Sequence, residues 1–184
     1  MCSSGGAPQA LTTDPATDAR PTWSQDGRWI YFASDRGGAG WNIWKIAFSG
    51  GPATQVTRSG GLFALESPDR KWLYFTVAGG VLRRMPVDGG EETDYVRDLG
   101  VPILGLDVSP FFVTAKGVYY LAVSANRRPT LIRFAGHEGG DSTTVGSIQR
   151  PPSAGLSLSP GGRFLVYSQY DQSTAEIMLV ENFH

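Results

Sequence analysis

The chain has 184 residues, 41% of them hydrophobic and 18% charged, so it is long enough to bury a hydrophobic core in one domain. Its 16 basic and 17 acidic side chains are scattered and give a formal net charge of −1, which argues against direct binding of nucleic acid. The 24 glycines and 12 prolines favour an all-β fold rich in tight turns over a fold of long helices.

Cys2 is the only cysteine, so an internal disulfide is impossible. No stretch approaches the roughly 18 apolar residues that a membrane span needs, and the first ten residues lack the apolar core of an export signal. We therefore expect a soluble protein without membrane insertion, either cytoplasmic or periplasmic. The compartment and the oligomeric state stay open.

The first predicted element is a short strand over residues 7–13, directly after a Gly-Gly pair. A hairpin turn follows at Ser24-Gln25-Asp26-Gly27. The side chains of Ser24 and Asp26 can accept hydrogen bonds from backbone amides, and Gly27 tolerates the positive φ of a short turn.

Three more strands complete the first unit. The apolar run 29–33 is typical of a strand that is covered on both faces. A strand over 41–48 leads to the turn Gly50-Gly51, and a short strand over 54–57 follows it.

The same order of turns and strands recurs along the chain. Positions equivalent to Gly27 are separated by 43, 47 and 45 residues, and the leading glycines of the Gly-Gly pairs by 45, 39 and 50. The first marker comprises Gly27, Arg70, Gly117 and Gly162, and the second comprises Gly5, Gly50, Gly89 and Gly139. Four short strands in a period of about 40 to 45 residues indicate a blade of a β-propeller. The third copy is the weakest match, because Lys116-Gly117 replaces Asp-Gly.

The repeats predict one domain over residues 1–184, an all-β propeller with about four blades of four antiparallel strands. The predicted blades cover approximately residues 14–57, 58–99, 100–148 and 149–184, and the strand over 7–13 completes the last one. Pairing of residues 10–13 with 178–181 would close the ring and remove both exposed sheet edges. The alternative is a fragment of a larger propeller, and both possibilities stay open.

The stretch from Ser34 to Thr57, with residues 23–32 before it, resembles the TolB-type, WD-repeat-like β-propeller repeat of bacteria. The residues that carry this resemblance are Trp23, Ser24, Asp26, Gly27, Tyr31, Ser34, Asp35, Arg36 and Gly50-Gly51, with Ser67, Pro68, Asp69 and Tyr74 in the second copy. The last copy departs from the motif, since Gly161 stands where the motif has Asp.

The end of the chain resembles the C-terminal propellers of bacterial winged-helix regulators and protein kinases. This resemblance implies a sensory or interaction role. Related propellers also accompany periplasmic transport machinery and prolyl-oligopeptidase-like peptidases, so the fold alone does not define a function.

The sequence predicts no catalytic residue, metal site or cofactor. A hydrolytic triad needs a base, and the only histidines are His137, beside a predicted turn, and His184, the last residue. The Gly-x-Ser-x-Gly pattern of serine hydrolases is absent. Cys2 has no partner at metal-ligand spacing, and no Asp-rich calcium loop occurs.

Loops at the rims of a propeller are the expected binding surfaces. Strand order places the turns at Asp26 and Gly50 on one rim and the loops between the second and third strands on the other. Arginine and aromatic residues are enriched at protein interfaces. The binding candidates on the second rim are therefore Arg36, Trp41, Arg127, Arg128, Tyr170 and Asp171. The residues with a predicted structural role in turns are Ser24, Asp26, Gly27, Asp69 and Gly162.

The leading functional prediction is a non-enzymatic propeller in a bacterial signalling or envelope protein, which recognises a protein, a peptide or a small ligand. The alternative is an accessory propeller that gates substrate for a hydrolase or peptidase whose catalytic domain lies outside this chain.

Overall fold

A computed structural model describes residues 7–38, 40–100, 110–123, 130–150, 152–159, 162–171 and 174–180. These residues form β-strands and no helix, so the predicted all-β class is confirmed. Among them there is accordingly no helix with the length and hydropathy to cross a membrane.

The strands form four antiparallel sheets in which each strand pairs with the next one along the chain. The first sheet contains β1 (Asp18–Trp23), β2 (Trp29–Ser34), β3 (Asn42–Ala47) and β4 (Thr54–Gln55). The second contains β5 (Phe63–Glu66), β6 (Trp72–Val77), β7 (Val81–Pro86) and β8 (Thr93–Val96). The third contains β9 (Phe111–Val113), β10 (Gly117–Val123), β11 (Thr130–Gly136) and β12 (Thr143–Ile148). The fourth contains β13 (Pro152–Leu158), β14 (Leu165–Asp171) and β15 (Thr174–Val180).

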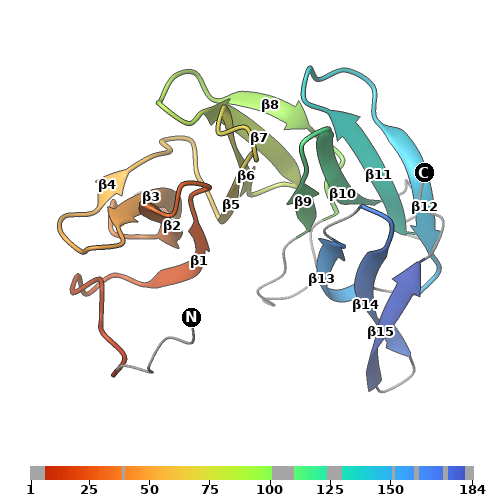
Figure 1. Ribbon diagram of the computed structural model, residues 1–184, viewed down its shortest axis with the longest axis horizontal. Helices are drawn as coiled ribbons and strands as arrows, with labels where there is room; N and C mark the ends of the chain where they lie inside the picture. The colour runs from red at the N-terminus through yellow and green to blue at the C-terminus, as the bar shows by residue number, and fades with distance from the viewer. Residues whose placement is uncertain are drawn as a thin grey trace.

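The four sheets follow one another around a common axis as the blades of a β-propeller (Figure 1). The first strand of each blade is innermost: β1 contacts β5, β5 contacts β9, and β9 contacts β13. Phe63 of β5 and Phe111 of β9 pack edge to face with their ring centroids 5.5 Å apart. The predicted propeller with four blades is therefore confirmed.

The hydrophobic core lies between consecutive blades. Successive side chains of a strand point to opposite faces of the sheet, so a middle blade supplies residues to two cores. In β6, Leu73 and Phe75 pack against the first blade, whereas Tyr74 packs against the third. Burial of one such side chain stabilises the fold by about 2 kcal/mol. A third cluster joins the last two blades, and no cluster of the described residues joins the fourth blade to the first.

Residues 7–13, predicted as a strand, are in no strand of the described chain, and residues 10–13 do not pair with residues 178–180; residue 181, the last of the predicted pairing, lies outside the described residues. Among the described residues β15 pairs only with β14, so the fourth sheet has three strands. Leu11 instead lines a shallow pocket together with Phe32 and Ile46 on the first blade. That face is apolar and has no neighbouring blade in the described part of the chain, so it offers Leu11 a local place to pack.

Candidate interaction site

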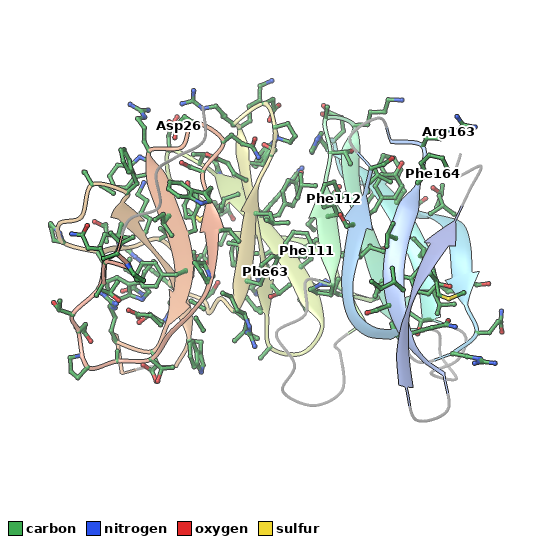
Figure 2. All side chains as sticks on the ribbon, turned by 60° about the horizontal axis from the view of Figure 1, so that its bottom comes forward. Asp26, Phe63, Phe111, Phe112, Arg163 and Phe164 are labelled. Atoms are coloured by element: carbon green, nitrogen blue, oxygen red, sulfur yellow. The ribbon has the colours of Figure 1, made fainter. Side chains whose placement is uncertain are left out.

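One rim of the propeller carries the turn between the first two strands of every blade. Every blade has the same order of antiparallel strands, so the turn after the first strand lies at the same edge of the molecule in each blade. Figure 2 shows Asp26 of the first blade and Arg163 of the fourth at this edge. We call it the turn rim, defined by residues 24–28, 67–71, 114–116 and 162–164.

The turn of the first blade is held by a network of short-range hydrogen bonds. The Ser24 hydroxyl donates to Asp26 Oδ1 at 2.8 Å and accepts from the Trp29 amide at 2.9 Å. Asp26 Oδ1 also accepts from the Arg28 amide at 3.0 Å. This backbone bond, with the bonds from Ser24 and the Arg28 side chain, holds the pKa of Asp26 well below its usual range. Asp26 is therefore an ionised structural group.

The second blade repeats this arrangement. Ser67 donates to Asp69 Oδ1 at 2.6 Å, and Trp72 N donates to the Ser67 hydroxyl at 2.9 Å. Arg70 takes the place of Gly27 and has a φ of 62°, in the left-handed region. Its guanidinium lies 3.2 Å from Asp26 Oδ2, so an ion pair joins the turns of the first two blades.

A buried carboxylate lies beneath these two turns. Glu66 is only 5% exposed, and its carboxylate accepts a hydrogen bond from the Gln25 amide. Burial raises the pKa of Glu66. The hydrogen bond from Gln25 lowers this pKa, and the negative charge of Asp26 raises it further. The ionised form is therefore disfavoured in the folded state.

The substitution Glu66→Gln is expected to leave the protein at least as stable as the wild type at pH 7. Because the pKa of Glu66 is higher in the folded state, its contribution to stability is largest below the ordinary value of 4.5 and is lost as pH rises through the folded pKa. Gln keeps an acceptor for Gln25 and carries no charge. Urea unfolding at pH 4 and pH 7 measures the difference, and a variant that loses more stability at pH 7 than at pH 4 would contradict this interpretation.

Two large aromatic side chains are exposed where the first blade meets the turn rim. Trp23 is 59% exposed and Phe48 is 57% exposed, and their ring centroids lie 6.4 Å apart. Trp23 pairs with Ile30 on the face that points away from the second blade. The Phe48 amide donates to the Arg28 carbonyl at 3.1 Å, which places a guanidinium-bearing residue beside the pair. We call Trp23 and Phe48 the aromatic pair.

Arg36, a predicted binding residue, is part of the packing of the same face. Its side chain is 10% exposed and binds both carboxylate oxygens of Asp18, at 2.7 and 2.6 Å. The guanidinium lies over the rings of Phe32 and Trp44, 5.1 and 5.2 Å from their centroids. Burial acts to raise the pKa of Asp18, but hydrogen bonds from Ser34, Arg36 and Thr12 outweigh it and lower the pKa.

The other predicted binding residues are not assembled into one site by the described structure. Trp41 is half-buried and packs against the core between the first two blades. Arg127 and Arg128 lie outside the described residues. Tyr170 and Asp171 pair with Ala175 and Thr174 in the hairpin of the fourth blade. Binding by these residues stays a prediction.

Two shallow pockets border the N-terminal segment on the first blade. One has a volume of about 200 Å³ and lies between Leu11 and the side chains of Phe32 and Ile46. The other, of about 250 Å³, extends past Arg36 to the turn at Pro52. Both are smaller than the roughly 300 Å³ at which small-molecule sites begin.

His137 forms hydrogen bonds that link the second and third blades. Its Nε2 lies 2.8 Å from the Thr114 carbonyl, which can only accept, so Nε2 carries the proton. Nδ1 lies 2.8 Å from the Tyr74 hydroxyl, which donates to it in the neutral ring. The Arg84 guanidinium, which stacks over Trp72 at 4.3 Å, donates to the His137 carbonyl. Both ring nitrogens have structural partners.

No group of acidic, histidine or cysteine residues in the described ranges has a metal-binding arrangement.

No protein-family model matches the chain. Its fold is similar to that of TolB from Acinetobacter baumannii, with a TM-score of 0.68 at 17% identity over 88% of this chain and 40% of that one. For the putative TolB from Agrobacterium tumefaciens the TM-score is 0.69 at 15% identity, over 94% of this chain and 61% of that one. A chain of a nidogen/laminin complex gives 0.67 at 12% identity, over 96% and 69%.

The structural neighbours are thus TolB-like and related propellers, as the motif resemblance implies. The chain spans less than two thirds of the length of either TolB chain. An oligogalacturonate lyase from Vibrio parahaemolyticus and prolyl oligopeptidase B from Galerina marginata share the fold with TM-scores of 0.62. These similarities establish the propeller architecture.

Proposed function

We propose that the chain is a non-enzymatic β-propeller interaction module of a bacterial signalling or envelope protein, and that it binds a protein partner at the turn rim. The observation that carries this proposal is the exposed aromatic pair, Trp23 and Phe48, beside Arg28. Tryptophan and arginine are enriched among the residues that contribute most to protein interfaces.

The packing of the first blade supports this choice of surface. Phe32 and Ile46 on the same face are buried, whereas the aromatic pair stays exposed. Burying two large rings would remove a substantial apolar area from water, and the polar turn beside them supplies hydrogen-bonding groups for an interface rim.

The comparisons agree with an interaction role. The nidogen propeller occurs in a complex with laminin, and TolB-like propellers are among the structures most similar to this chain. A role without catalysis agrees with the hydrogen bonds of His137, Asp26 and Glu66, since each of these groups is bonded to the surrounding fold.

An accessory role beside a catalytic domain is the alternative. Its support is the similarity to prolyl oligopeptidase B, in which the match covers 90% of this chain and 28% of that one. A partner that proves to be a hydrolase or peptidase segment would favour this role over sensing.

The aromatic pair provides the test. We expect the double substitution Trp23→Ala/Phe48→Ala to reduce capture of the partner from a lysate of the source cell by at least about tenfold, since hot-spot residues contribute about 2 kcal/mol each. The matched control is Ile177→Ala, which removes a side chain that is 81% exposed on the fourth blade. Circular dichroism should show the same fold for both variants. Unchanged capture by the double variant would reject the turn rim as the interface.

A further inference from the structure

Exposed cations occur in each of the four turns that follow the first strands, which we call the inner turns. Arg28, Lys71 and Arg163 each follow the residue of their turn that has a left-handed φ, and Lys116 lies in the corresponding turn of the third blade. Arg70 adds a fifth exposed cation in the second turn. Because each of these turns follows the first strand of its blade, they share one rim of the propeller, where Figure 2 shows Asp26 and Arg163 at the same edge.

The cations outnumber the carboxylates in these turns. In the first two blades, Asp26 pairs with Arg28 and Arg70, and Asp69 lies 3.8 Å from Lys71. In the last two blades the aspartate of the motif is replaced, by Lys116 in the third turn and Gly161 in the fourth. Lys116 and Arg163 form no ion pair within the described ranges. The inner turns therefore have a formal charge of +3, although the whole chain has −1.

The turns between the third and fourth strands lie on the same side of the propeller, and we call them the outer turns. In two blades their charge is opposite to that of the inner turns. These turns join the third and fourth strands of the second and third blades, and they lie farther from the axis. Their exposed acidic residues are Asp88, Glu91, Glu138 and Asp141. On this side of the propeller the inner turns thus have a formal positive charge, and the outer turns have a formal negative charge.

We propose that the inner turns bind a short acidic segment of a partner protein, whose carboxylates pair with these exposed cations. This inference rests on the proposed function, because it names the chemistry of the partner at the same rim. A continuous polyanion such as nucleic acid would have to cross the acidic outer turns, which would repel its phosphates. A short peptide with spaced carboxylates avoids that repulsion and matches separate guanidinium and ammonium groups.

One side chain of this set is already ordered by its turn. The Arg163 guanidinium lies 5.3 Å from the centroid of the Phe164 ring, and the amides of both residues donate to the Ser159 hydroxyl. The charge is therefore held near the rim before a ligand arrives, which lowers the entropy cost of binding.

The test uses a fluorescein-labelled peptide of five Glu-Gly repeats as the probe, with fluorescence anisotropy as the readout. We expect the wild type to bind it and the affinity to fall as salt is raised, because exposed charges are screened. Lys116→Glu/Arg163→Glu should weaken binding by about tenfold. Arg58→Glu/Arg97→Glu, which reverses two exposed arginines on the opposite rim, one of them paired with Asp94, should bind like the wild type.

Three outcomes would overturn this inference: no binding of the Glu-Gly peptide, equal losses in the two charge-reversal variants, or tighter binding of a ten-residue thymidine oligonucleotide. The last outcome would assign the rim to nucleic acid. The proposed function is tested separately, by partner capture with the Trp23→Ala/Phe48→Ala variant. Partner capture that depends on Trp23 and Phe48 but not on Lys116 and Arg163 would retain the interaction role and reject the acidic segment.

Discussion

Replacing Arg36 by Ala is expected to lower the free energy of unfolding by about 3 kcal/mol. The substitution leaves the Asp18 carboxylate on a largely buried face without its bidentate partner and uncovers the rings of Phe32 and Trp44. Urea denaturation followed by tryptophan fluorescence measures the loss. The stability difference from the wild type should shrink at low pH, because the pKa of Asp18 is lowered in the folded state and its contribution disappears as pH falls through that pKa.

Arg28→Ala is the control for this experiment. Arg28 also forms an ion pair with an aspartate, but its side chain is 70% exposed, so we expect a loss of about 0.5 kcal/mol or less. The double variant Asp18→Ala/Arg36→Ala should lose less than the sum of the two single losses, since the second substitution removes the uncompensated charge. If Arg36→Ala were as mild as Arg28→Ala, the guanidinium would not hold this face together.

Gly117→Ala is expected to cost about 3 kcal/mol through overpacking of the third blade. A Cβ atom at this position would lie 2.2 Å from the Ala135 carbonyl oxygen and 2.8 Å from Cζ of Phe134. The carbonyl belongs to the neighbouring strand β11, so the clash can be relieved only by separating paired strands. Thermal and urea unfolding of the variant would measure this loss.

Gly136→Ala is a matched control, because Gly136 is the register partner of Gly117. A Cβ atom at Gly136 meets no atom within 4 Å, so we expect a change of less than about 0.5 kcal/mol. Equal losses in the two variants would show that strand composition, and not the close approach at Gly117, determines the stability of this hairpin.

Arg36 shows where interpretation of the sequence alone was insufficient. Its position after a strand and beside glycines predicts an exposed loop residue that is available to a ligand. The tertiary structure surrounds it with Asp18, Phe32 and Trp44, which come from three different strands of the first sheet. The register between those strands brings the groups together, and turn chemistry alone does not reveal which side chain will fold back onto a sheet.

The aromatic pair is the converse case. The aromatic strand pattern predicts that Trp23 is part of the core between blades, yet it is more than half exposed. Tyr31 of the same sheet faces the second blade and is buried. Trp23 lies on the opposite face, for which the described chain supplies only the N-terminal segment around Leu11. A signal for this exposure is absent from the local sequence, because exposure depends on which faces have a neighbouring blade: Glu66 and Val113, at the equivalent position of the middle blades, are both buried.

The repeat of turns and short strands was determined by the sequence itself. At Gly27, Arg70 and Gly162 the φ angles are 68°, 62° and 69°, so three copies of one local pattern adopt one backbone conformation. Such turns depend on a few adjacent residues, which is why spacing alone predicted the blades. Only the tertiary structure decided which blade faces are covered, where the N-terminal segment packs, and which cations lack a carboxylate partner. Those features depend on contacts between residues far apart in the chain, and such contacts form only when whole sheets pack together.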